Sequence, residues 1–76
     1  MKLADIPVGK SVRITDVTTL NELVRRRLMD LGIMEGAVIS LRKTLPFGGP
    51  FTIESSGQWI AIRRSEACQI AVEGVC

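Results

Sequence analysis

Apolar and polar residues alternate along most of the chain, and this period of two predicts short β-strands with one buried face. In the first such stretch, Val12 and Ile14 fall on one face while Arg13 and Thr15 fall on the other. The later stretches place isoleucine, leucine or phenylalanine on their inward faces in the same way. The predicted strands cover residues 10–17, 37–44, 51–54, 58–63 and 69–73.

A helical period interrupts the alternation after the first strand. Apolar residues recur there at the intervals of one helix face, which predicts an amphipathic helix over about residues 20–31. Thr19 and Glu22 have the spacing of a capping box, so Thr19 is the expected N-cap. Gly32 follows where a left-handed residue ends many helices, and Ile33 could make the accompanying apolar contact. The expected stripe consists of Leu20, Leu23, Val24, Leu28 and Leu31.

Glycine and proline divide the remaining elements. Gly36 is expected at positive φ before the second strand, and Ser55, Ser56 and Gly57 form a hairpin turn. Residues 64–68 suggest one helical turn. The chain is therefore expected to be mainly β: a five-stranded barrel with one α-helix inserted after the first strand and a short helical turn before the last. Barrel closure is favoured because it removes exposed edges, and the helix would plug or cover one end.

Composition and charge exclude several classes of protein. The chain has 76 residues, enough for a single domain over residues 1–76, and 46% of them are apolar. A net charge of +2 is too small to indicate nucleic acid or an anionic membrane as a partner. Histidine and tyrosine are absent, which argues against an enzyme. Neither a signal peptide nor a run of about 18 apolar residues is present, so a cytoplasmic protein without direct membrane insertion is expected.

The two cysteines, Cys68 and Cys76, do not indicate a metal or redox site. They lack the paired spacing of a metal-binding motif, no histidine accompanies them, and the carboxylates are scattered along the chain. We expect both to be reduced thiols, and we expect no metal and no cofactor. The sequence leaves open whether either cysteine has a redox role.

Four groups of residues, in order, carry a family resemblance. They are Leu3-x-x-Ile6-Pro7-x-Gly9, Arg27-Leu28-x-x-Leu31-Gly32-Ile33-x-x-Gly36, Pro46-x-Gly48-Gly49-Pro50 and Ile60-Ala61-Ile62-Arg63-x-x-Glu66-Ala67. Over nearly the whole chain this pattern resembles the FeoA family, the small cytoplasmic accessory proteins of bacterial ferrous-iron transport. Glu35, where proline is common, and Cys68, often alanine, depart from it. The resemblance implies an SH3-like barrel and a partner, the membrane transporter FeoB with its cytoplasmic GTP-binding domain.

Candidate partner-binding residues lie at three places, each with a structural alternative. Leu45 and Phe47 could anchor a partner, or Phe47 could fold back on the barrel rim. Trp59 points away from Ile60 and could anchor an interface, or the helix or the N-terminal turn could cover it. Arg25 and Arg26 could steer an acidic partner, or could be a solvated helix face.

The leading hypothesis is a non-enzymatic accessory protein that binds the cytoplasmic part of a FeoB-type transporter and supports its assembly or GTP-dependent activity. One alternative is a regulatory SH3-like module that contacts a metal-dependent repressor, and a small RNA-binding barrel is a weaker one. The sequence leaves open self-association, the barrel face used, and whether the protein activates or inhibits its partner.

Overall fold

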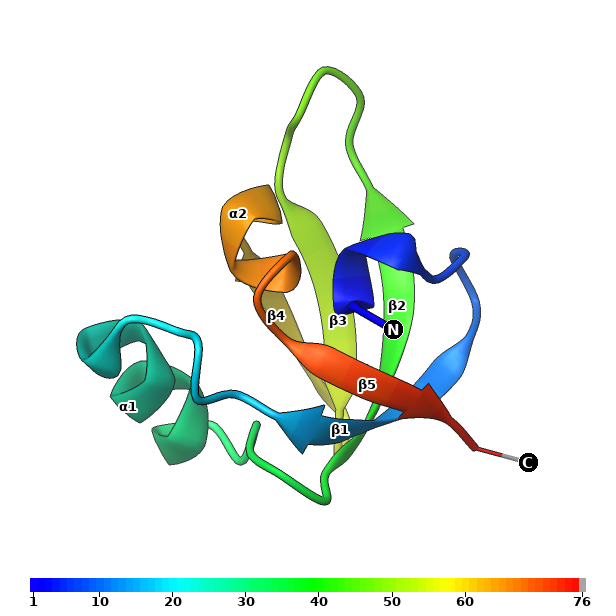
Figure 1. Ribbon diagram of the computed structural model, residues 1–76. Coiled ribbons are helices and arrows are strands. Elements are labelled where there is room, and N and C mark those ends of the chain that lie inside the picture. Colours follow the sequence, from blue (N-terminus) through cyan, green and yellow to red (C-terminus); the bar gives the residue numbers. More distant parts are fainter. Residues whose placement is uncertain (76) are drawn as a thin grey trace.

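The computed structural model of the protein describes residues 1–75, and all five predicted strands are present in it. The strand bounds differ from the expected ones by two residues at most. Figure 1 shows the strands wrapped around one another, with one longer and one shorter α-helix beside them. The elements are η1 (Leu3–Asp5), β1 (Ser11–Asp16), α1 (Glu22–Asp30), β2 (Val38–Thr44), β3 (Phe51–Ser55), β4 (Gln58–Ile62), α2 (Arg64–Ala67) and β5 (Ala71–Gly74).

The strands form one antiparallel sheet in the order β4-β3-β2-β1-β5. Within residues 1–75, β4 and β5 do not pair, so the sheet is open and the expected closure into a barrel is wrong. The chain leaves β4 through α2 and returns beside β1, and the N-terminal segment occupies the outer side of β5. There Leu3 N donates to Ile70 O (2.9 Å), and Val72 N donates to Met1 O (2.8 Å).

The core lies on the inner face of this sheet, as the alternation predicts. Val12 and Ile14 are buried between exposed neighbours, and the later strands follow the same rule. Because β-branched and leucine side chains fill nearly all inward positions, the core needs only one aromatic ring, Phe51. The buried apolar residues are Leu3, Ile6, Val12, Ile14, Val17, Leu20, Leu28, Ile33, Ile39, Leu41, Phe51, Ile53, Ile62, Ala67, Ile70 and Val72.

The start of α1 differs from the prediction. Asn21, not Thr19, is the N-cap, and its side chain accepts a hydrogen bond from Leu23 N (2.8 Å). The preceding residues form a turn in which Thr18 N and Thr18 Oγ1 both donate to Asp16 Oδ1 at 2.7 Å. These two bonds lower the pKa of Asp16 below its usual range. Leu20 is buried in the core from this turn, so the helix begins later than the capping-box spacing suggests.

The predicted apolar stripe of α1 is only partly correct. Leu28 is buried and Val24 packs partly against the core, but Leu23 is 75% exposed and Leu31 is 38% exposed. Figure 1 shows α1 at one side of the sheet. Of its nine residues, Leu28 alone is fully buried. The helix therefore leaves apolar side chains on the surface.

The end of α1 follows the prediction closely. Gly32 has a φ of +84°, a conformation that costs an L side chain energy and that glycine adopts freely. Ile33 N donates to Leu28 O (2.8 Å) and Gly32 N to Met29 O (2.9 Å), the two bonds of a Schellman motif. Ile33 is buried beneath the turn, and Gly36 also has the expected positive φ.

Candidate functional site

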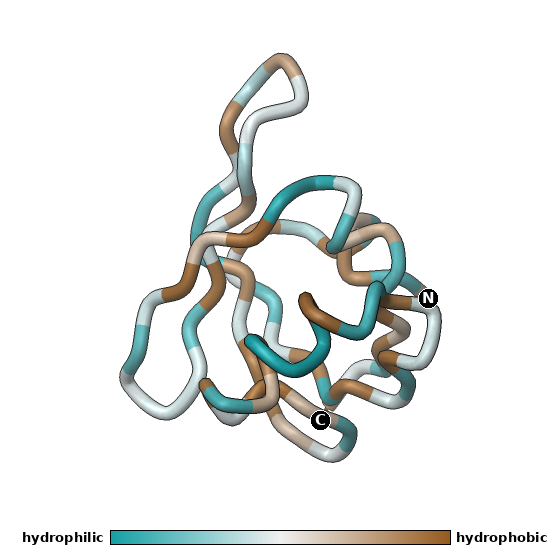
Figure 2. The backbone as a smooth tube through the Cα atoms, turned by 90° about the vertical axis from the view of Figure 1, so that its left-hand side faces the viewer, coloured by the Kyte–Doolittle hydropathy of each residue, from teal (hydrophilic) through white to brown (hydrophobic). Residues whose placement is uncertain are grey.

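The loop between β2 and β3, residues 45–50, extends away from the rest of the molecule (Figures 1 and 2). It closes on itself, since Leu45 N donates to Pro50 O (3.4 Å) and Gly49 N donates to Pro46 O (3.2 Å). Leu45 is partly exposed at its base. The loop therefore presents its tip to solvent as a compact unit.

Phe47, at the tip of this loop, is fully exposed and has a φ of +61°. The alternative that it folds back on the rim is wrong, because the loop carries it outward and Phe51 already supplies the aromatic ring of the core. A bulky residue at positive φ stores about 1–3 kcal/mol of strain, which in native proteins clusters at functional positions. Because the exposed Phe47 ring adds nothing to the core and its backbone is strained, Phe47 is the strongest candidate for an anchor of a partner protein.

Gly49 holds the loop closed, and replacing it should open the loop. A Cβ atom at this position would lie 2.7 Å from Leu45 Cβ, closer than side chains tolerate. We expect Gly49→Ala to lower the free energy of unfolding by about 1–3 kcal/mol, as for other overpacked sites. Urea unfolding would measure this. Gly48→Asn is the control, because Gly48 faces open space and asparagine tolerates its φ of +77°. Equal stability of the Gly49→Ala variant and the parent would contradict this account.

A hollow of about 480 Å³ lies beside the loop, and two arginines line it. Arg63 and Arg64 stand at the start of α2, and the Arg64 guanidinium lies 5.5 Å from the centre of the Phe51 ring. Neither forms an ion pair with another residue in 1–75. Neither was among the partner-binding residues expected from the sequence. Their position could have indicated a role in binding. Positive charge at a helix N-terminus is unfavourable because it opposes the helix dipole, so two arginines there do not serve helix stability.

Trp59 lies on the outer face of β4 and is 64% exposed. The alternative that the helix or the N-terminal turn covers it is wrong, because the N-terminal turn packs at β5, the other edge of the sheet. Its cross-strand neighbour is Glu54, which forms an ion pair with Arg42 (2.6 Å). Trp59 is thus exposed, but near the hairpin turn and away from the β2–β3 loop.

The arginine run on α1 divides into three environments. Arg26 pairs with Glu22 one turn earlier (3.5 Å) on a highly exposed face, a contact worth little energy. Arg27 reaches Glu66 on α2 (3.4 Å). Arg25 lines a groove on the other flank. Figure 1 shows α1 at the lower left and the β2–β3 loop at the top of the molecule, so the expected residues do not form one surface.

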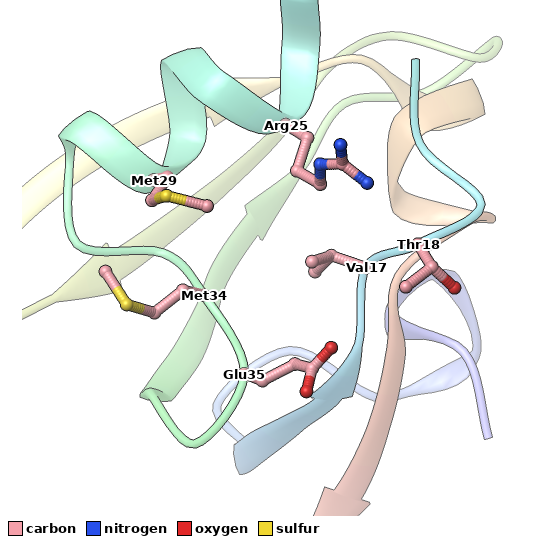
Figure 3. A pocket seen from close by; sticks show the side chains of 6 residues that line it. All are labelled: Val17, Thr18, Arg25, Met29, Met34 and Glu35. Atoms are coloured by element: carbon pink, nitrogen blue, oxygen red, sulfur yellow. The ribbon is translucent and has the colours of Figure 1, made fainter. Parts of the chain in front are cut away.

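The groove beside Arg25 has a volume of about 240 Å³ and is mainly apolar. Figure 3 shows Met29 from α1 and Met34 from the following turn lying one above the other, with Arg25 and Glu35 on the side toward Val17. This groove was not expected from the sequence, because Met29 falls outside the predicted stripe and Met34 lies in a turn. Partly exposed methionines on a helix flank are the signal that could have indicated it.

Within residues 1–75, no three histidine, cysteine, aspartate or glutamate side chains lie close enough together to hold a metal ion. Cys68 is an exposed free thiol. The expectation for Cys76 lies outside the described residues. No helix in the described part of the chain has the length and apolar character needed to span a bilayer.

Comparison with solved structures shows what this fold resembles. The FeoA protein of Chlorobium tepidum is 36% identical, with a TM-score of 0.93 over 100% of this chain and 71% of that one. The FeoA of Stenotrophomonas maltophilia, solved in complex with zinc and described as an SH3 domain protein, is 28% identical, with a TM-score of 0.81 over 96% of this chain and 89% of that one. A manganese-dependent transcriptional repressor shares the fold alone, at 13% identity and a TM-score of 0.87 over 99% of this chain and 41% of the repressor.

A search of curated proteins finds no match. The FeoA domain family, by contrast, matches residues 1–74, nearly the whole chain. The fold agrees with that match, since it is mainly β, consists of five antiparallel strands in one sheet, and superimposes on FeoA structures described as SH3-like. On its sequence and its fold, the chain belongs to the FeoA family.

Proposed function

We propose that this protein is a non-enzymatic, cytoplasmic accessory protein of ferrous-iron uptake that binds the cytoplasmic part of a FeoB-type transporter. Family membership supports the pathway. The Stenotrophomonas maltophilia relative is described as possibly acting as a ferrous iron transport activating factor, which supports the accessory role. By binding the transporter, this protein would support its assembly or its GTP-dependent activity.

The observation that carries the surface assignment is the exposed Phe47 at positive φ. Its loop lines a hollow together with two arginines that form no ion pair within residues 1–75. Aromatic and arginine side chains supply most binding energy at protein interfaces. Leu45 adds exposed apolar surface at the base of the loop, and Arg63 and Arg64 suit an acidic surface on the partner. We name this set the loop surface: Leu45, Phe47, Arg63 and Arg64. Trp59, Arg25 and Arg26 lie on other faces of the molecule. We therefore do not include them in the surface that contacts the transporter.

Binding to the purified cytoplasmic part of the transporter from the same cell tests this proposal. We expect Arg63→Gln combined with Arg64→Gln to weaken binding about tenfold at low salt and to flatten its salt dependence, because rim charges act mainly by steering. Arg26→Gln with Arg25→Gln is the matched control, since it removes the same charge from α1. Absence of binding in the nucleotide-free, GDP-bound and GTP-bound states would refute the partner. Equal loss in both double variants would refute the surface.

The second candidate function is a module that contacts a metal-dependent repressor. Its only support is that this chain and part of a manganese-dependent repressor have the same fold. The same assay with a repressor from the source cell separates the two. Binding of the repressor without binding of the transporter would replace the first proposal with the second.

A further inference from the structure

The two edges of the sheet differ in how they are protected. The outer side of β5 is covered by hydrogen bonds between Met1–Leu3 and Ile70–Val72. On the other edge, β4 pairs with β3 alone, and no backbone hydrogen bond from elsewhere in residues 1–75 reaches Gln58–Ile62. Figure 1 shows β4 at the back of the molecule, away from the N-terminal segment. The strand β4 is therefore a free edge.

The turn before β4 determines which backbone groups face that edge. Ser56 (φ +51°) and Gly57 (φ +83°) form a two-residue type I′ hairpin turn, which makes Ser55 and Gln58 a hydrogen-bonded pair. Such pairs alternate along an antiparallel ladder. The amides and carbonyls of residues 60 and 62 therefore bond to β3. The two amides and two carbonyls of Trp59 and Ala61 point outward, and no backbone group within residues 1–75 bonds to them.

Proteins usually protect such an edge with a charge, a proline or a bulge. Gln58–Ile62 contains neither a charge nor a proline, and the β3–β4 register is continuous, whereas the β2–β3 and β1–β5 registers both shift. The exposed side chains of this strand are Trp59 and Ala61, and Ile60 is only partly buried. An unprotected edge with a large aromatic has the properties of a pairing site.

We propose that β4 pairs antiparallel with β4 of a second copy of this chain, around a two-fold axis through Ile60. In this register Trp59 of one copy lies opposite Ala61 of the other, so both residues exchange all of their outward backbone groups and form four hydrogen bonds. A register centred on Ala61 would instead need the amide of Arg63, which already donates to Glu66 Oε1 (3.0 Å). A register centred on Trp59 would use Gly57 of the tight turn.

Side chains also favour a second copy as the occupant. The large Trp59 ring would cover the small Ala61 of the partner copy on the outer face, twice by symmetry. The half-buried Ile60 would meet its own symmetry mate on the inner face. Because the strand carries no charge, two copies approach without repulsion, whereas nothing on this strand would select a charged partner peptide. The contact is small, so the dimer is expected to be weak and concentration-dependent.

This inference does not rest on the proposed function. Trp59 lies beside the hairpin turn, at the end of β3 opposite to the β2–β3 loop, so Leu45 and Phe47 stay free in the dimer, whereas Arg63 directly follows the paired strand. Loss of the dimer should leave transporter binding by the monomer intact, and loss of Phe47 should leave the dimer intact. The two proposals can therefore fail separately.

Sedimentation of the full chain between about 10 μM and about 1 mM tests the pairing, since weak interfaces associate in this range. We expect the weight-average mass to rise toward that of a dimer. Ala61→Pro removes an outward amide that the monomer does not use, and edge strands tolerate proline there. It should stay monomeric while its amide spectrum remains folded. Ala61→Ser keeps the amide and a small side chain and should still dimerise. A parent protein that remains monomeric at the highest concentration would overturn the proposal.

Disulfide trapping tests the register in a background with Cys68→Ser and Cys76→Ser. Residues at position 60 of the two copies would form a non-hydrogen-bonded pair with Cα atoms about 4.5 Å apart, which a disulfide spans. Ile60→Cys should therefore give a covalent dimer under mild oxidation. Residues at position 61 would be separated by about 8 Å, beyond a disulfide, so Ala61→Cys is the control. Equal cross-linking of the two variants, or none with Ile60→Cys, would overturn this register.

Discussion

Replacing Glu66 by alanine is expected to lower the free energy of unfolding by about 1.5–3 kcal/mol, the range for hydrogen bonds to charged groups. For a chain of 76 residues this is a fall of roughly 10–20 °C in the melting temperature. Glu66 is only 8% exposed although it is charged. Its carboxylate accepts hydrogen bonds from Arg63 N (3.0 Å) and from the Arg27 side chain (3.4 Å).

The larger part of this cost comes from the backbone. Arg27 is more than half exposed, so its ion pair with Glu66 is weakened by solvent. Arg63 N, by contrast, is the N-cap amide of α2, and Glu66 is the third residue of that helix. Removing the carboxylate leaves this amide without its acceptor and takes negative charge from the helix N-terminus, where it is stabilising. A four-residue helix has few other interactions to compensate for these losses.

Two control substitutions separate these contributions in thermal and urea unfolding. Glu66→Gln keeps an acceptor oxygen for Arg63 N while removing the charge, so about half of the loss should return. Glu22→Ala breaks the exposed pair with Arg26 and should change stability by less than about 0.5 kcal/mol. If Glu66→Ala proved no more harmful than Glu22→Ala, the capping role of Glu66 would be wrong.

The second large effect concerns Phe47, where stability and binding are expected to change in opposite directions. Phe47→Asn replaces a bulky residue at positive φ by one that tolerates this conformation, so the melting temperature should stay equal or rise by a few degrees. Removal of the exposed ring should weaken transporter binding at least tenfold, because a central aromatic anchor contributes more than about 1.4 kcal/mol. Thermal unfolding and a binding titration on the same samples measure both.

Trp59→Leu is the matched aromatic control. Trp59 is exposed and lies near the hairpin turn, away from the β2–β3 loop, so this change should leave transporter binding unchanged. Phe47→Leu should retain part of the affinity, since it keeps apolar area at the loop tip. Unchanged binding by Phe47→Asn would show that the loop surface is not the site of contact.

Much of the fold could be predicted from local pattern. The strands followed from strict alternation around residues such as Val12, Ile14, Ile39 and Leu41, because a one-residue error would expose each whole inner face. The end of α1 could be predicted from Gly32 and Ile33, because a glycine followed by an apolar residue is typical of the Schellman motif at a helix C-terminus. Each of these features is decided by residues close together in sequence.

The errors occurred where distant contacts decide the outcome. Thr19 and Asn21 are both acceptable N-caps, and burial of Leu20 in the tertiary structure selects the later one. The predicted barrel closure fails because Met1–Leu3, about 70 residues earlier in the chain, pairs with the outer side of β5 in place of β4. Either phenylalanine could have packed in the core. The alternation of β3 turns Phe51 inward, and Phe47 remains exposed.

The Met1–Leu3 segment, which pairs with the outer side of β5, also determines how many strand edges each copy can use to pair with other copies. With the Met1–Leu3 segment in place, the described part of each copy offers one free edge, β4, so edge pairing stops at two copies. If that segment came away from Ile70 and Val72, each copy would offer two unlike edges, and the same kind of backbone hydrogen bond would add copies without limit. Three N-terminal residues thus separate a finite assembly from a growing filament.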